Sequence, residues 1–197
     1  MSTSKIENQN ELILYLKTYF SVHDAEARTL ADLFIEEEVD KEEYFAQAGM
    51  SCYKLSFIQC GYLRIFANLD GKEVTQWISG QGDFVCDLSS LMFKTAARWN
   101  IQALEPCKLY SIKGDTYDKL PELLPRWSQL EKLFLSKCFL TLEDRVFSFL
   151  SMTAEERFNY LFNYRPALFN EVPLHYLASM LGMTPETLSR IRRKIIS

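Results

Sequence analysis

The chain has 197 residues, of which 48% are hydrophobic and 24% are charged, and its formal net charge at pH 7 is −4. This composition is typical of a globular protein that buries one large core or two small ones. No apolar run approaches the roughly 18 residues that cross a membrane, and the N-terminus lacks a signal-peptide pattern, so we expect a cytoplasmic protein without a membrane partner.

The first forty residues are expected to be helical. Asp24 is placed to cap the second of two helical segments. Apolar residues recur at helical spacing in both segments, at Leu12, Leu16 and Tyr19 and then at Ala27, Leu30, Ala31 and Phe34.

From about residue 39 to residue 113 the pattern changes to that of short strands. Runs of alternating, β-branched or aromatic residues occupy residues 54–60, 62–68, 74–79, 99–104 and 108–112. Turn residues separate these runs, and Asp70-Gly71 is a strong signal for a two-residue hairpin. Regularly spaced short strands of this kind predict an antiparallel barrel or sandwich.

A long helix is predicted from about Pro125 to Leu150, which corresponds to roughly 37 Å. One apolar face contains Trp127, Leu130, Phe134, Cys138, Leu142, Val146 and Phe149, and a second contains Leu133, Leu135, Phe139 and Leu140. A helix that is apolar on two faces must be covered twice. We expect the β-domain to cover one face and the same helix of a second chain to cover the other, so that polar residues at Leu130 and Phe134 would dissociate a homodimer. The alternative is a helix buried within one chain.

Two short amphipathic helices are predicted at the end of the sequence, after a helix that begins with the capping-box pair Thr153 and Glu156. The first of the two buries Leu174, Leu177, Ala178 and Leu181, and the second buries Leu188, Ile191 and Ile195. Gly182 ends the first helix, and Thr184 caps the second, which has Pro185 at its first position. This spacing is that of a DNA-binding helix-turn-helix, although an ordinary antiparallel helix pair is the alternative.

The second helix of this pair presents a polar, basic outer face. The candidate DNA-binding residues are Thr184, Glu186, Ser189, Arg190, Arg193 and Lys194. From residue 184 to residue 197 there are four basic residues and one acid, whereas an acidic stretch occupies residues 36–40. Because a phosphate backbone responds to local charge, the net charge of −4 does not exclude double-stranded DNA as the partner.

The sequence gives little support for a metal site, a redox-active cysteine motif or an enzyme. The two histidines, His23 and His175, lie outside the predicted strands, so a cupin-type metal site lacks its ligands. The five cysteines are widely spaced, which argues against a zinc, redox or iron–sulfur motif. We therefore expect no metal, no cofactor and no enzymatic activity.

The order of these elements resembles the Crp/Fnr family of bacterial transcription regulators over nearly the whole chain. The hairpin of that family is similar to Cys60 to Phe66 with Asp70-Gly71-Lys72. The start of its ligand cassette is similar to Gly82-Asp83-Phe84, and its recognition helix is similar to Thr184 to Arg190. The resemblance implies an α+β protein with an N-terminal jelly-roll (double-stranded β-helix) domain of the cyclic-nucleotide-binding type in residues 1–120. It further implies a dimerisation helix in residues 121–150 and a helix-turn-helix domain in residues 151–197. Members often add a β-wing after the recognition helix, and the sequence ends at Ser197, so no wing is expected.

The resemblance also implies a function, namely transcription regulation by a homodimer bound to a pseudo-palindromic operator. Glu186 and Arg190 match the positions that read bases, and residues i and i+4 share one helix face. Arginine pairs with guanine O6 and N7, and a carboxylate accepts from cytosine N4. Pro185 replaces another arginine of better-known members. The alternative function is a signal-sensing or protein-interaction module whose helix-turn-helix does not bind DNA.

The ligand cassette departs from the family pattern. The candidate effector-pocket residues are Gly82, Asp83, Phe84, Asp87, Arg98 and Trp99. Where cyclic-nucleotide binders carry a Gly-Glu pair, this chain has Cys86-Asp87. Where they carry an Arg-Ser/Thr-Ala run, it has Ala97-Arg98-Trp99. The arginine that pairs with the cyclic phosphate in those proteins is therefore absent here or displaced by one residue. Residues 87–91 are predicted to form a short helix, and Trp77, Phe84 and Trp99 add aromatic bulk nearby. We expect a pocket filled by its own side chains, or one that takes an unidentified small-molecule effector other than cyclic AMP.

Overall fold

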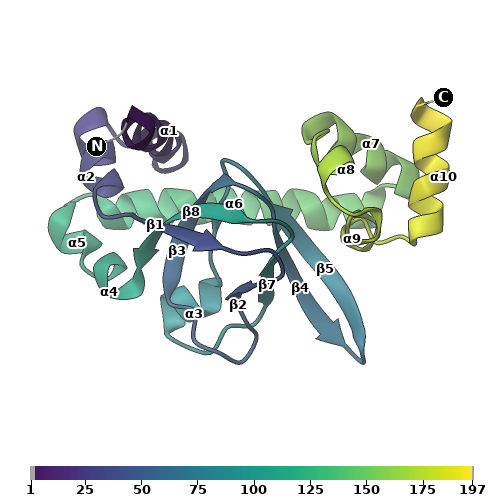
Figure 1. Cartoon of the computed structure of the whole chain (residues 1–197), viewed down its shortest axis with the longest axis horizontal. Coiled ribbons are helices and arrows are strands. Elements are labelled where there is room, and N and C mark those ends of the chain that lie inside the picture. Colours follow the sequence, from purple (N-terminus) through teal and green to yellow (C-terminus); the bar gives the residue numbers. More distant parts are fainter. Residues whose placement is uncertain (1–2, 197) are drawn as a thin grey trace.

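The computed structural model describes the backbone of residues 3–196 and the side chains of residues 10–194. Two helices lead into a β-roll, a long helix follows, and shorter helices form the C-terminal end (Figure 1). The helices are α1 (Thr3–Phe20), α2 (Asp24–Ala31), α3 (Leu88–Phe93), α4 (Gly114–Tyr117), α5 (Leu120–Leu123), α6 (Trp127–Ser151), α7 (Ala154–Tyr164), α8 (Leu168–Glu171), α9 (Leu174–Met180) and α10 (Pro185–Ile196). The strands are β1 (Ile35–Val39), β2 (Tyr44–Ala46), β3 (Lys54–Cys60), β4 (Leu63–Leu69), β5 (Lys72–Ser79), β6 (Phe84–Val85), β7 (Asn100–Ala103) and β8 (Cys107–Lys113).

The strands form two four-stranded antiparallel sheets, in the orders β1-β8-β3-β6 and β2-β7-β4-β5. Of the predicted antiparallel barrel or sandwich of short strands, the structure shows the sandwich. Asp70 and Gly71 connect β4 to β5 with φ values of +52° and +80°. Positive φ at both central residues is the geometry of a type I′ hairpin turn, as the Asp-Gly pair predicts.

Residues 35–39, which we expected to be helical, form the edge strand β1. This strand pairs with β8, Glu37 forms an ion pair with Lys54, and Ser111 Oγ donates a hydrogen bond to the Glu37 carboxylate at 2.6 Å. Acidic side chains suit an edge strand because part of it meets solvent. Residues 35–39 form a strand because they pair with β8, which lies about seventy residues further along the chain, and the residues next to them in sequence do not predict this pairing.

The predicted cap of α2 also needs correction. Asp24 is the first residue of the helix, and His23 precedes it as the N-cap. The backbone N–H of His23 donates to the Glu26 carboxylate at 3.0 Å. Asp24 instead forms an ion pair with Lys17 of α1.

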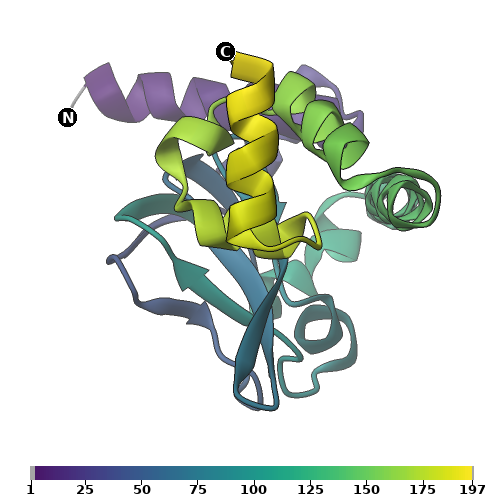
Figure 2. The same cartoon turned by 90° about the vertical axis from the view of Figure 1, so that its right-hand side faces the viewer.

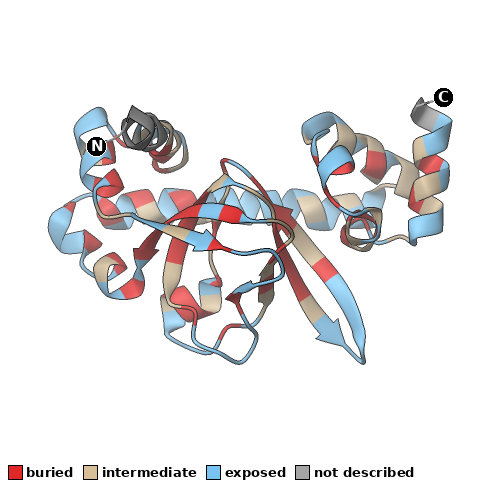
Figure 3. Cartoon of the chain, viewed as in Figure 1, coloured by how far each residue is buried: buried red, intermediate tan, exposed pale blue. Residues whose placement is uncertain are grey.

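Buried residues, which are red in Figure 3, form three clusters that hold the elements together. The first packs α1 and α2 against the roll and the first half of α6, and it contains Leu16, Phe20 and Phe57. The second fills the inside of the roll. The third joins α7, α8, α9 and α10 and includes Ile78 of β5, so the C-terminal helices share a core with the roll. None of the described helices is long and apolar enough to cross a membrane.

The long helix predicted from residue 125 to residue 150 is confirmed as α6, but its two faces are not used as we expected. Leu130 and Phe134 are buried in the first cluster, where the Phe134 ring lies 4.8 Å from the ring of Phe20. Polar residues at these two positions would therefore disrupt the core of one chain instead of separating two chains. The exposed apolar side chains of α6 are Leu133, Phe139, Leu140, Leu142, Val146, Phe147, Phe149 and Leu150.

Candidate functional site

A tight turn joins α9 to α10, as the sequence predicts. The Gly182 N–H donates to the Ser179 carbonyl at 3.1 Å, and the Met183 N–H donates to the Ala178 carbonyl at 3.0 Å. These are the two bonds of a Schellman motif. Gly182 has a φ of +66°, and a Cβ added there would lie 2.6 Å from the ring of Phe149. The turn therefore needs glycine both for its backbone conformation and for space.

Two of the predicted DNA-binding residues also cap α10. Thr184 Oγ1 accepts a hydrogen bond from the Thr187 N–H at 3.3 Å, which is the predicted N-cap. Hydrogen bonds from its own backbone N–H and from Thr184 lower the pKa of the Glu186 carboxyl. Both side chains are exposed at the first turn of the helix. The Ile195 side chain, predicted to be buried, lies outside the described residues.

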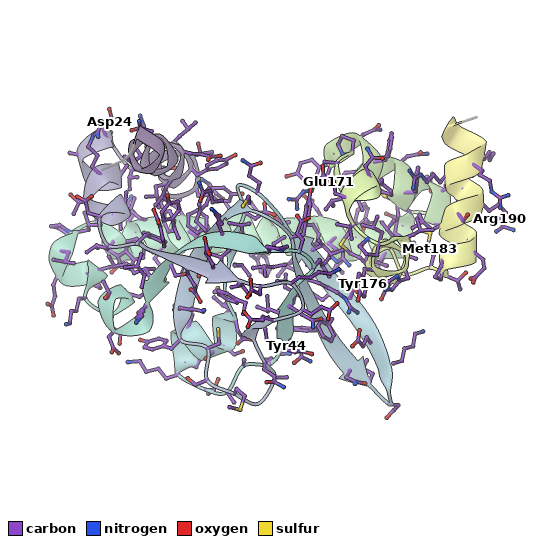
Figure 4. The ribbon with its side chains drawn as sticks, viewed as in Figure 1. Asp24, Tyr44, Glu171, Tyr176, Met183 and Arg190 are labelled. Carbon is purple, nitrogen blue, oxygen red and sulfur yellow. The ribbon has the colours of Figure 1, made fainter. Side chains whose placement is uncertain are left out.

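The outer face of α10 carries exposed arginines. Arg190 points away from the C-terminal helices, and α10 stands at the end of the molecule (Figures 2 and 4). Arg193 is also exposed, and Ser189 is half-buried. Lys194 differs from these residues because it forms an ion pair with Glu155 of α7 at 3.0 Å. The structure thus brings the predicted residues to one helix and turns Lys194 toward its neighbour.

The helix α9 packs against β5 (Figure 1). The Thr75 N–H of β5 donates to Ser179 Oγ of α9 at 2.9 Å. Ile78 of β5 lies in the same buried cluster as Leu177 and Ala178 of α9. The position of α9 and α10 is therefore set by contact with the roll.

A buried arginine, which the sequence analysis missed, joins β4 to α9. Arg64 is 1% exposed, and its guanidinium carbon lies 4.1 Å from the ring centre of Phe66 and 4.0 Å from that of Tyr176. It also donates to Thr75 Oγ1 at 2.9 Å and to the Glu73 carboxylate at 2.6 Å. Two rings and one carboxylate thus stabilise the buried charge. No local pattern marks Arg64, because these partners are spread over β4, β5 and α9.

Gly82, Asp83 and Phe84, predicted to line an effector pocket, face other parts of the chain. A Cβ at Gly82 would lie 2.7 Å from the hydroxyl of Tyr15 in α1. The Asp83 carboxylate pairs with Arg165 at 2.7 Å and accepts the Gly80 N–H at 2.9 Å. Phe84 packs on the first buried cluster, not on the cluster inside the roll. The expected pocket position of these three residues is therefore corrected: they join the roll to α1, α6 and the C-terminal helices.

Asp87, another predicted pocket residue, is buried and accepts three backbone hydrogen bonds. It is 1% exposed and caps α3, the helix predicted for residues 87–91. Its carboxylate accepts the backbone N–H groups of Ser90 at 2.9 Å, Arg98 at 2.8 Å and Trp99 at 3.2 Å. A carboxylate of the chain itself therefore occupies the N–H donors that would otherwise favour a bound anion.

Arg98 and Trp99 have different surroundings. The Arg98 side chain is exposed, and its guanidinium carbon lies 6.0 Å from the Trp99 ring centre. Trp99 and Trp77 are half-buried, and both pack on the cluster inside the roll. Phe84 packs on the first cluster instead.

Residues 36–122 match a family model described as the cyclic nucleotide-binding domain. Among solved structures, FixK2 from Bradyrhizobium japonicum is similar with a TM-score of 0.69 at 18% identity, covering 82% of this chain and 84% of that one. The catabolite activator protein of Thermus thermophilus has a TM-score of 0.58 at 20% identity, covering 92% of this chain and 86% of that one. The regulatory domain of Toxoplasma gondii PKA with cAMP has a TM-score of 0.52 at 18% identity and covers 60% of this chain. The chain spans only 45% of that domain.

At these identities the likeness shows the fold alone. The chain contains a jelly-roll β-sandwich of the cyclic-nucleotide-binding type followed by helices, and this arrangement matches Crp/Fnr-like folds. No curated protein sequence matches the chain significantly.

Proposed function

We propose that this chain is a DNA-binding transcription regulator of the Crp/Fnr type, which binds a pseudo-palindromic operator as a homodimer. The outer face of α10 carries the proposal. Arg190 and Arg193 are exposed there and form no ion pair with any side chain that the structure describes. Free guanidinium groups on a protruding helix suit both base edges and phosphates.

The exposed apolar face of α6 supports the dimer. Phe139 and Val146 are seven residues apart on this helix and are 61% and 59% exposed. Side chains at this spacing share a helix face that a second copy of α6 can cover. A two-fold dimer would place two copies of α10 about 34 Å apart, which is one turn of DNA.

The first test is the Arg190→Ala variant. If Arg190 pairs with a guanine, its loss should cost about 1–3 kcal/mol of binding free energy and relax the preference at one base position. Arg193→Ala should weaken binding to all sequences alike and reduce the salt dependence, as expected for a phosphate contact. Lys194→Ala should have a smaller effect because Lys194 already pairs with Glu155. Mobility-shift assays on duplexes selected from a random pool provide the measurement.

The matched control is Arg28→Ala, which removes an exposed arginine of α2 and should leave DNA affinity unchanged. An identical base preference with and without Arg190 would contradict its assigned role. If no duplex is selected at all, the chain is the alternative, an interaction or signal-sensing module.

The second test concerns cyclic nucleotides. Calorimetry with cyclic AMP and cyclic GMP should show no binding tighter than about millimolar, a level that corresponds to ~4 kcal/mol. The reason is that Asp87 already holds the N–H groups of Arg98 and Trp99, and Trp99 packs on the interior of the roll. A micromolar dissociation constant that is lost in Arg98→Ala but kept in Arg28→Ala would overturn this expectation.

A further inference from the structure

A cavity of about 240 Å³ lies where α6, α7, the end of α9 and β5 meet. Its lining includes Trp77, Asp144, Arg145, Phe149, Arg157 and Tyr160. Trp77 lies between this cavity and the inside of the roll, and no residue of α10 lines the cavity. Neither the predicted DNA contacts nor the predicted effector pocket makes use of it.

Arg145 is held in this cavity without a carboxylate partner. One of its terminal nitrogens donates to the Met180 carbonyl at 2.7 Å, and its guanidinium carbon lies 5.3 Å from the Trp77 ring centre and 5.0 Å from that of Phe149. Among the described side chains it forms no salt bridge. Burial lowers the pKa of Arg145 to about 10, in keeping with a charge removed from water.

Arg157 provides a second guanidinium beside the ring of Phe149. It donates to the Leu181 carbonyl at 3.0 Å and to the Met152 carbonyl at 2.7 Å, and it lies 4.9 Å from the Phe149 ring centre. No described carboxylate pairs with it either. Each guanidinium has five N–H donors, so both arginines keep donors beyond those that bind main-chain carbonyls.

The remaining walls narrow the class of ligand. Trp77, Phe149 and Tyr160 present aromatic surface, which favours a planar body. Asp144 is exposed at the lining and can accept a hydrogen bond from a hydroxyl or amino group. The two arginines outnumber this one carboxylate in the lining, so the cavity has a net positive charge and favours an anion.

We propose that this cavity binds a small aromatic carboxylate that carries a hydroxyl or amino substituent. The carboxylate would pair with the guanidinium groups of Arg145 and Arg157. The ring would lie against the aromatic walls, and the substituent would donate to Asp144. Because the two arginines also donate to the carbonyls of Met180 and Leu181, such a ligand would lie beside the end of α9, where the α9–α10 turn begins. The proposal concerns direct binding and does not depend on DNA recognition.

Calorimetry on the full chain tests this with salicylate, which combines a ring, a carboxylate and a hydroxyl. We expect a submillimolar dissociation constant for salicylate and at least about tenfold weaker binding of salicylamide, its neutral analogue, because the charge-assisted pairing is lost. Inorganic phosphate should also be at least about tenfold weaker, because it lacks the ring. Equal affinity for salicylamide, equal affinity for phosphate, or no salicylate binding by the folded protein would each overturn the proposal.

Two matched variants locate the site. Thr141 lines the cavity, and its hydroxyl donates only within α6, to the Lys137 carbonyl at 3.0 Å, so Thr141→Phe should fill the cavity and abolish salicylate binding. Ser136 makes the same kind of bond, to the Lys132 carbonyl at 2.8 Å, but does not line the cavity, so Ser136→Phe should bind as the unaltered chain does. If Thr141→Phe does not fold, Tyr160→Ala removes one aromatic wall and should weaken salicylate about fivefold or more. Unchanged affinity in the folded cavity variant would contradict the proposed location.

Discussion

Replacing both Phe139 and Val146 by glutamate should convert the protein from a dimer to a monomer. Both side chains are more than half exposed in the single chain and lie seven residues apart on α6. Fully burying an apolar side chain contributes about 1.5–3 kcal/mol, and a two-fold dimer would bury the exposed part of four of these. Even at about 0.9 kcal/mol each, their loss weakens association by between about two and three orders of magnitude. Sedimentation or light scattering at micromolar concentration measures the change.

A matched control separates the role of α6 from a general effect of surface charge. Met50 and Phe93 are also large exposed apolar residues, at 61% and 75%, but they lie on the roll. Met50→Glu with Phe93→Glu should leave the dimer intact. Loss of operator binding should accompany the monomer only in the α6 variant, because one copy of α10 reads only half of a palindrome. A monomeric unaltered protein at these concentrations would disprove the dimer.

The Asp87→Ala variant should be destabilised by about 3 kcal/mol or more, because each buried N–H left without an acceptor costs about 1–3 kcal/mol. Asp87 accepts from the N–H groups of Ser90, Arg98 and Trp99, and its side chain is buried. Urea unfolding followed by circular dichroism should show a lower midpoint with an unchanged slope. The control is Asp115→Ala, at an exposed aspartate in the first turn of α4, which should change stability by only about 0.5 kcal/mol.

Chemical rescue makes the Asp87 test specific. Formate has the size of the lost carboxylate, so it should restore part of the stability of Asp87→Ala and have no comparable effect on the unaltered chain. This result is expected because a ligand that binds only the folded state raises its stability. A variant within about 1 kcal/mol of the unaltered protein, or one insensitive to formate, would show that the Asp87 carboxylate does not stabilise the roll through these three N–H groups.

Several elements follow from short stretches of sequence alone. Asp70-Gly71 forms its hairpin, Thr153 and Glu156 form their capping box, and Gly182 ends α9 in the left-handed conformation. Each of these depends on the conformational preference of a few neighbouring residues, which is the same in any fold. The strand β1 shows the opposite case, since residues 35–39 form a strand only because β8 lies beside them.

The sequence by itself therefore determined the order of elements, the turn between α9 and α10, and the charged residues that line α10. Tertiary structure decided which faces meet. Leu130 and Phe134 pack inside one chain while Phe139 and Val146 stay exposed, and both pairs satisfy the same helical period. It also decided that Arg64 stacks on Tyr176, and that Asp83 binds Arg165 instead of a ligand. The physical reason is that helical period and capping act between neighbours, whereas ion pairs, ring stacking and burial depend on residues that only the folded chain brings together.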